Sequence, residues 1–131
     1  MKTKLATLTL CIGLSACSIF PSRFDSQEHA KLVDIHVISK DSSACQRNDI
    51  AQALVEVMYK DAEWVWHYGQ DLPNNDKMSA MQQNLLQMTK EFHERYKQSE
   101  PVSAFYCRSK FENIHKATDT IIKVSARRPR I

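Results

Sequence analysis

The stretch from residue 76 to residue 98, DKMSAMQQNLLQMTKEFHERYKQ, decides the fold class. Apolar side chains recur in it at intervals of three and four residues: Met78, Met81, Leu85, Met88, Phe92 and Tyr96. This spacing places one apolar stripe along a helix about 33 Å long. Asn75, just before it, is a candidate N-cap. The stretch therefore predicts a long amphipathic helix that packs against other helices.

Two further segments show the same spacing. Residues 101–125 predict a helix with Pro101 at its first position and with these apolar residues: Phe105, Phe111, Ile114, Ile121 and Val124. A helix upstream ends near Gly69, which suits the position after a helix C-terminus. Its apolar residues are Ile50, Leu54, Val57, Met58, Val65 and Tyr68. Ser43 and Gln46 have capping-box spacing, which would put Cys45 in its first turn.

A shorter helix is expected from about residue 25 to residue 39, with Leu32, Ile35 and Ile38 as its apolar positions. The alternating segment VDIHVIS (33–39) could instead form a strand, but the sequence offers no obvious partner strand. The connections are short, which favours antiparallel neighbours. The sequence thus predicts one all-α domain, a small three- to four-helix up-and-down bundle.

The N-terminus has the organisation of an export signal. Lys2 and Lys4 precede an apolar run from residue 5 to residue 14, and small residues lead to Cys17. The run is shorter than the roughly 20 residues of a membrane span. A charged start, a short apolar region and a small-residue site indicate a segment that is removed.

Leu14, Ser15, Ala16 and Cys17 resemble the lipobox of bacterial lipoproteins. The resemblance covers about twenty residues and implies cleavage before Cys17 and acylation of that cysteine, which anchors the chain to a membrane. Residue 18 is Ser and not the Asp that commonly retains lipoproteins in the inner membrane, so the resemblance implies the periplasmic face of the outer membrane. The alternatives are an ordinary secretory signal or an N-terminal core helix.

The expected organisation is a signal peptide (1–16), a lipidated linker (17–24), the helical bundle (25–125) and a basic C-terminal tail (126–131). Cys45 and Cys107 remain as a pair in an oxidising compartment, which predicts one disulfide. Neither has a second ligand at metal-site spacing. In an up-down-up order, the helices that follow Cys45 and contain Cys107 are parallel, so their N-terminal ends can meet.

Charge excludes one class of partner. Without Lys2 and Lys4 the chain has 16 basic and 15 acidic residues, which gives no nucleic-acid signal. The surplus is local, with Arg127 and Arg128 in a tail that either is solvated or contacts an anionic partner. We expect this tail to be disordered.

The segment EWVWHY (63–68) holds both tryptophans of the chain. Trp64 and Trp66 are about 200° apart on a helix, so both cannot face one core. One of them is either exposed at an interface or packed under a neighbouring segment. Together with Arg127 and Arg128, they are the candidate interface residues.

No cofactor and no metal site is expected. The five histidines are interpreted as solvent-facing, and they form no metal-binding motif. Met78, Met81, Met88 and His93 could suggest haem or copper, but a methionine stripe at helical spacing usually fills a core.

The sequence contains no catalytic motif, which favours a protein that is not an enzyme. The leading hypothesis is an outer-membrane lipoprotein whose helical domain binds another envelope protein as an accessory or assembly factor. Two alternatives stay open. One is a bundle that holds haem, a metal or a small apolar molecule, and the other is an exclusion or lysis-related lipoprotein encoded by a phage or plasmid.

Overall fold

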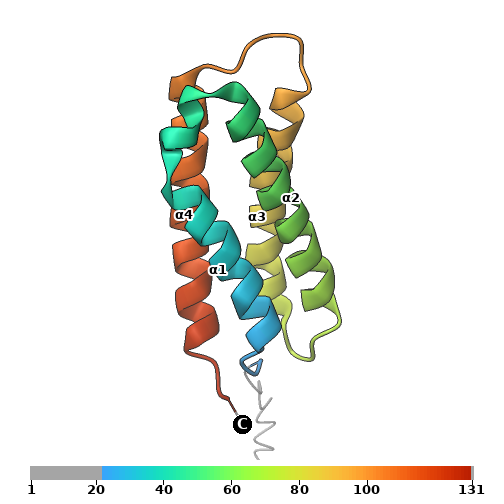
Figure 1. Ribbon diagram of the computed structural model, residues 1–131. Coiled ribbons are helices and arrows are strands. Elements are labelled where there is room, and N and C mark those ends of the chain that lie inside the picture. Colours follow the sequence, from blue (N-terminus) through green and yellow to red (C-terminus); the bar gives the residue numbers. More distant parts are fainter. Residues whose placement is uncertain (1–21, 131) are drawn as a thin grey trace, which may run out of the picture.

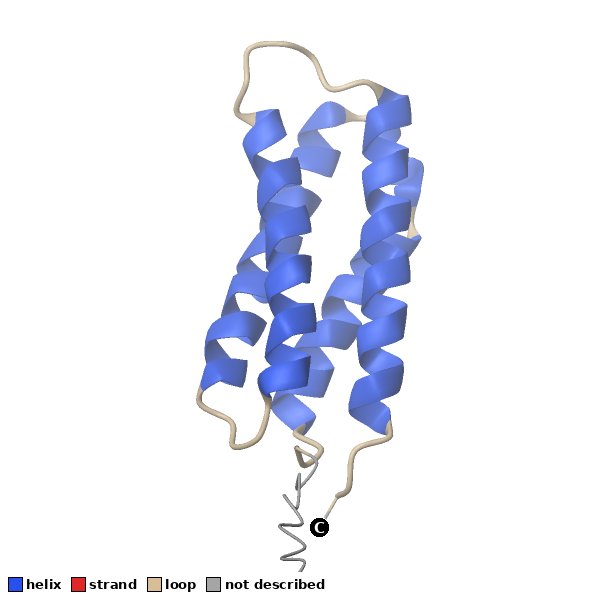
Figure 2. Cartoon of the chain, turned by 180° about the vertical axis from the view of Figure 1, so that it is seen from behind, coloured by secondary structure: helices blue, strands red, loops and turns tan. Residues whose placement is uncertain are grey.

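A computed structural model describes residues 22–130, which form four α-helices and one short 3₁₀ helix (Figure 1). The helices are α1 (Ser26–Lys40), η1 (Ser42–Gln46, the 3₁₀ helix), α2 (Asn48–Gln70), α3 (Asp76–Tyr96) and α4 (Ala104–Ala126). Within this range there is no strand, and the alternating segment 33–39 is helical (Figure 2). The predicted all-α bundle with one disulfide is confirmed.

The helices pack as a ring in which α1 contacts α2, α2 contacts α3, α3 contacts α4 and α4 contacts α1. Successive helices run up and down, so α2 and α4 are parallel and lie across the diagonal (Figure 1). We call the end that holds Cys45 and Cys107 the disulfide end. The opposite end, where residues 22 and 130 and the α2–α3 loop lie, is the terminal end.

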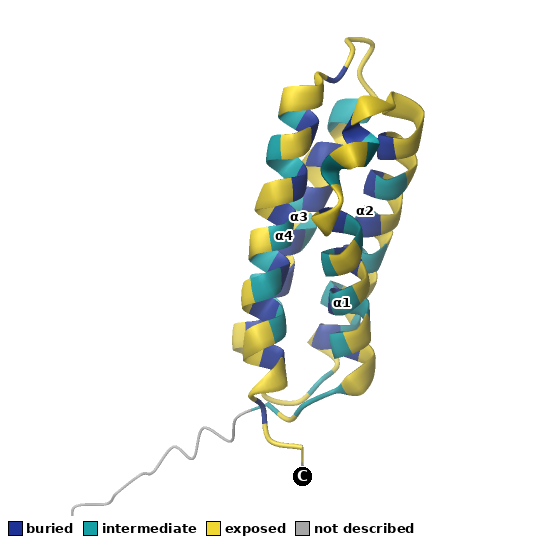
Figure 3. Ribbon diagram, turned by 60° about the vertical axis from the view of Figure 1, so that its left-hand side comes forward, coloured by how far each residue is buried: buried dark blue, intermediate teal, exposed yellow. Residues whose placement is uncertain are grey.

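The buried positions of every helix alternate by four and three residues. They are Glu28, Leu32, Ile35 and Ser39 in α1; Ala51, Val55, Met58, Ala62, Val65 and Gly69 in α2; Met78, Gln82, Leu85, Thr89 and Phe92 in α3; and Cys107, Phe111, Ile114, Thr118, Ile121 and Ser125 in α4. This is the heptad pattern of helices that pack at a shallow angle. Figure 3 shows the buried positions facing inward.

Several expected core positions are exposed instead. Phe105 is 75% exposed, Val57 45%, Ile50 38% and Val124 36%. In α3, Gln82 and Thr89 are buried, whereas Met81 and Met88 only pack against the core. The heptad spacing allows only one of two neighbouring residues, such as Met81 and Gln82, to face the core. Which of the two is buried depends on this spacing and not on hydrophobicity alone.

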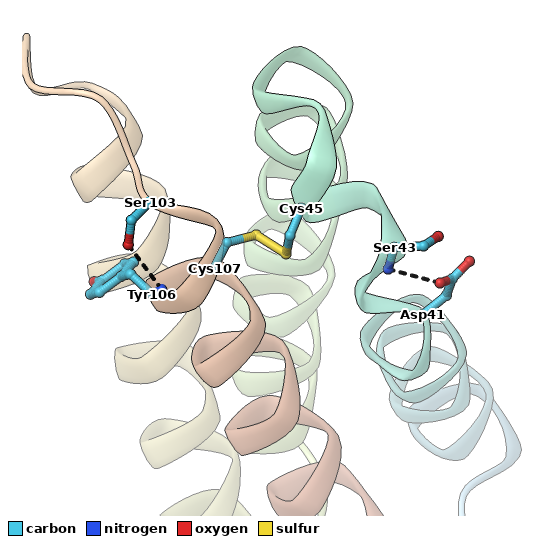
Figure 4. The surroundings of a disulfide bond; sticks show 6 residues. All are labelled: Asp41, Ser43, Cys45, Ser103, Tyr106 and Cys107. Carbon is cyan, nitrogen blue, oxygen red and sulfur yellow. Dashed lines mark hydrogen bonds between the residues drawn. A yellow bond between two sulfur atoms is a disulfide. The ribbon is translucent and has the colours of Figure 1, made fainter.

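The helix starts also differ from expectation. Ser103 caps α4 by accepting from Tyr106 N at 3.1 Å, so Pro101 lies in the preceding loop. Asp41 caps η1 by accepting from Ser43 N at 2.9 Å, and the expected Ser43–Gln46 capping box does not form (Figure 4). Cys45 therefore lies in the 3₁₀ helix and not in the first turn of α2.

None of the helices among residues 22–130 combines the length and the hydropathy needed to cross a membrane.

Candidate functional site

The predicted disulfide is present between Cys45 of η1 and Cys107 of α4, with the two Cα atoms 5.7 Å apart (Figure 4). Both cysteines are buried. The bond closes a loop of sequence separation 62 that contains α2 and α3. It thus joins the connection after α1 to the start of α4. The predicted lipidation residue Cys17 and the signal segment 1–16 lie outside the described residues.

A buried polar cluster occupies the terminal end of the core. It consists of Glu28, Asn75, Gln82 and Arg128, each no more than 7% exposed, and we call it the polar core cluster. Glu28 Oε2 accepts from Asn75 Nδ2 at 2.9 Å and from Gln82 Nε2 at 2.7 Å. Glu28 Oε1 forms an ion pair with Arg128 Nη2. The cluster therefore connects α1, the α2–α3 loop, α3 and the residues after α4.

Arg128 makes further contacts that hold it in place. Its Nη1 donates to Asn75 Oδ1 at 3.0 Å, and its Nη2 donates to Ser125 Oγ at 3.2 Å. Next to it, Phe24 N donates to Pro129 O at 2.8 Å, and the Arg130 guanidinium lies 4.1 Å above the Phe24 ring.

The expectation of a solvated or partner-binding tail is thus wrong for Arg128. Its charge is needed inside the fold, because a buried Glu28 carboxylate without a partner would be costly. Arg127 is exposed, as expected.

Gly69 belongs to the same end of the molecule and lies inside α2, not after it. Its φ is not positive, so its role is not conformational. A Cβ at this position would be closer to Gln82 Oε1 than van der Waals radii allow, and 3.1 Å from Asn75 Nδ2. A methyl group at this position would therefore have to displace the Gln82 amide, whose Nε2 donates to Glu28.

The two tryptophans contact different neighbours, as their spacing predicts. Trp64 is 37% exposed and stacks on Tyr68 with the ring centroids 4.6 Å apart. Tyr68 in turn donates to Asp25 of the α1 start at 3.1 Å. Trp66 is half-buried and lines a cleft of about 250 Å³ between the end of α2 and the start of α3. Only Trp64 adds to an exposed apolar surface.

That surface runs along the outer side of α1 and α2. Ile50, Val57 and Trp64 are exposed at a spacing of seven residues on α2, and Val37 of α1 is 62% exposed. Val37 and Ile50 line one cleft of about 370 Å³. We call these four residues the α1–α2 apolar face. Beside this face, an ion pair between Lys31 Nζ of α1 and Asp61 Oδ1 of α2, at 3.0 Å, joins the two helices.

The histidines differ from the expectation that all five face solvent. His67 is exposed, but the other four are half-buried between helices. His36 of α1 stacks on His115 of α4 with the ring centroids 4.0 Å apart. Burial, followed by the charge of His115, lowers the pKa of His36. Burial, followed by the charges of Arg130 and Arg128, lowers the pKa of His29.

The stacked pair has defined hydrogen bonds. Thr118 Oγ1 lies within hydrogen-bond distance of Ile114 O, at 3.0 Å, and His36 Nδ1 lies 2.9 Å from the same hydroxyl oxygen. His115 Nδ1 lies 3.3 Å from His36 O, which can only accept. These contacts join α1 to α4.

The residues considered for haem or copper occupy separate places. Met78 is buried in the core, and Met88 packs against the core. His93 stacks on Tyr59 of α2 with the ring centroids 4.9 Å apart. Within residues 22–130 no group of three His, Cys, Asp or Glu side chains is placed to hold a metal ion.

No family model matches the chain, and neither a curated protein nor a solved structure matches it significantly.

Proposed function

We propose that this chain is a lipid-anchored protein of the outer membrane whose periplasmic helical domain binds another envelope protein, without catalysis. The N-terminal signal and the lipobox resemblance around Cys17 support the anchor. The α1–α2 apolar face supports the binding role, and it is the observation that carries the proposal.

This face has the geometry of a helix-binding surface. The core side of α2 is already buried in the bundle through residues such as Val55 and Met58. Ile50, Val57 and Trp64 form a second stripe of heptad spacing on the same helix, about 10 Å from one residue to the next. Stripes of this kind accept the apolar side of another helix. The partner segment we propose is an amphipathic helix of an envelope protein.

Two valines of similar exposure give a matched test. Val57 lies on the α1–α2 apolar face and Val124 lies on α4, with 45% and 36% of their surface exposed. A photo-crosslinking residue placed at position 57 in the full chain should capture one defined envelope protein in cells. Placed at position 124, it should not capture that protein.

The contact between the α1–α2 apolar face and the captured protein is then tested by introducing a charged residue. With the crosslinker at Trp64, the Val57→Glu variant should lose the adduct, and the Val124→Glu variant should keep it. Both variants should unfold at nearly the same urea concentration as the wild type, because both positions are exposed. Equal adducts in the two variants, or the same captured protein from both positions, would refute the proposed face.

The anchor has its own test. Mass spectrometry of the protein from the envelope should show the mass of the chain from Cys17 plus acyl groups, and the Cys17→Ser variant should lack the acyl mass. A native protein that carries no mass beyond its amino acids would contradict lipidation, whatever the outcome at Val57.

A further inference from the structure

A polar cleft at the disulfide end carries a second inference. The cleft has a volume of about 420 Å³ and lies between the end of α1, the start of η1 and the first turns of α4. Phe105, Arg108, Ser109 and Glu112 line it at helical spacing from α4, and Lys40 and Ser42 line it from the other side. We call it the α1–α4 cleft.

The two walls of the cleft are joined covalently. Cys107 lies between Phe105 and Arg108 on one wall, and Cys45 follows Ser42 on the other. The Asp41 carboxylate accepts from Ser43 N (Figure 4). Asp41 is not among the residues that line the cleft. Because the disulfide holds the walls together, the cleft is formed before a ligand arrives, which lowers the entropic cost of binding.

The charge in the cleft is positive. Among residues 22–130, neither Lys40 nor Arg108 has an acidic partner within ion-pair distance. The acid in the cleft lining, Glu112, is paired with Lys116 Nζ at 2.7 Å. Two uncompensated cations therefore face one neutralised carboxylate.

Hydroxyl groups supply further donors. Ser42 and Ser109 make no side-chain hydrogen bond to the rest of the described chain, and both are half-buried at the cleft. The deeper Ser39 is only 2% exposed and is already used, since it donates to His36 O at 2.9 Å. The cleft thus offers two cationic groups and two available hydroxyls, a set that suits an oxyanion.

An apolar group stands beside these donors. Phe105 has 75% of its surface exposed, the largest exposed fraction among the large apolar side chains of residues 22–130. Its position two residues before the buried Cys107 turns it away from the core. A ligand that fits both features carries an oxyanion next to an apolar group.

The position of the cleft separates a peptide from a lipid headgroup. The elements that line the cleft, which are the end of α1, the start of η1 and the first turns of α4, lie away from the end where α1 begins (Figure 1). The 23 residues of α4 span about 34 Å between the two ends. If Cys17 is anchored as proposed, the cleft faces away from the bilayer that holds the protein. We propose that the α1–α4 cleft binds a carboxylate in an acidic peptide segment, with an adjacent apolar side chain of that segment packing on Phe105.

The test uses the full chain in a non-ionic detergent and a fluorescein-labelled peptide of sequence Asp-Glu-Phe-Asp-Glu. Fluorescence anisotropy should show saturable binding of this peptide, and no binding of the amide analogue Asn-Gln-Phe-Asn-Gln. The double variant Lys40→Gln, Arg108→Gln should weaken binding at least tenfold. Phe105→Ser should weaken it by a smaller factor.

A matched control removes the same charge elsewhere. Lys77 and Lys90 of α3 are exposed and have no acidic partner within residues 22–130, so Lys77→Gln, Lys90→Gln changes the net charge equally. This control should keep wild-type affinity. Equal weakening by both double variants would overturn the proposal, and so would binding of inorganic phosphate without binding of the peptide. Because the crosslinking test at Val57 concerns another face, its failure and the failure of this proposal are distinguishable.

Discussion

Gly69 shows how one missing side chain supports a buried charge. Its lack of a Cβ lets Gln82 and Asn75 approach the α2 backbone and bond Glu28. In an exposed helix, replacing Gly by Ala stabilises by about 1 kcal/mol. Here we expect the opposite: Gly69→Ala should lower the free energy of unfolding by about 1–3 kcal/mol, measured by urea denaturation.

The cause can be checked with a second substitution. In the background of Gln82→Ala the obstructing amide is absent, so adding Gly69→Ala should cost much less than it does in the wild type. A cost that is the same in both backgrounds would place the clash elsewhere.

Glu28 and Arg128 stabilise the fold as a pair, and either charge left alone in the core destabilises it. Glu28→Gln removes one charge and leaves Arg128 buried without a counter-ion, which should cost about 3–5 kcal/mol of unfolding free energy. The double variant Glu28→Gln, Arg128→Met should be more stable than Glu28→Gln alone, because no buried charge is left. Denaturation of the wild type, both single variants and the double variant checks this coupling. Additive costs would show that the ion pair contributes little.

At the scale of elements, the sequence predicts the four helices well, because 3.6-residue periodicity and the short connections are local properties. It predicts their buried faces less well. Phe105 and Val57 look like core residues by hydrophobicity, yet the heptad register shared with the neighbouring helices leaves them exposed. The register depends on all four helices at once, so no single segment reveals it.

The polar core cluster has the same explanation. Glu28 begins the series that continues through Leu32 and Ile35, and Arg128 follows Ser125 by three residues, so both extend a heptad seam. This is the signal that could have identified them. A pattern search for apolar residues passes over it, and the partnership across 100 residues exists only in the folded chain.

The α1–α4 contact predicts a dependence on pH. The pKa of His36 and that of His29 are both lowered by burial, so the folded state prefers the neutral rings. The unfolded chain then takes up protons first as the pH falls below about 6.5. The contribution of these two rings to the free energy of unfolding should be constant above pH 7, and the free energy of unfolding should decrease as the pH falls towards 5.

Substitution separates the effect of these two histidine rings from that of the Asp and Glu side chains, which also take up protons at acidic pH. The variant His29→Asn, His36→Asn should show a smaller decrease in unfolding free energy between pH 7.5 and pH 5 than the wild type. His67→Asn, at an exposed position, should keep the wild-type decrease. The prediction fails if all three proteins have the same pH profile of urea denaturation.

At the scale of the whole molecule, a covalent bond joins distant segments at one end of the bundle, and a buried polar cluster joins them at the other end. The disulfide joins η1 to α4 at one end, and the polar core cluster joins α1 to the residues after α4 at the other. The chain-entropy description assigns about 4 kcal/mol to a disulfide that closes a loop of this length. Reduction should therefore shift the urea midpoint to lower concentration while the helical circular dichroism at zero urea is retained.

The double variant Cys45→Ala, Cys107→Ala controls for the reductant. Its urea midpoint should match that of the reduced wild type and should not change when dithiothreitol is added. If reduction left the wild-type midpoint unchanged, the crosslink would contribute nothing to stability.

The placement of the disulfide between η1 and α4 has a mechanical consequence. Suppose that the chain is pulled at residue 22 while a partner holds the disulfide end at Phe105. The tension then runs along α1, passes through Cys45 and Cys107 into α4, and bypasses α2 and α3, which lie inside the covalent loop. The helix α2, with its exposed stripe of Ile50, Val57 and Trp64, would carry little of the load and could keep its shape while the tether is taut.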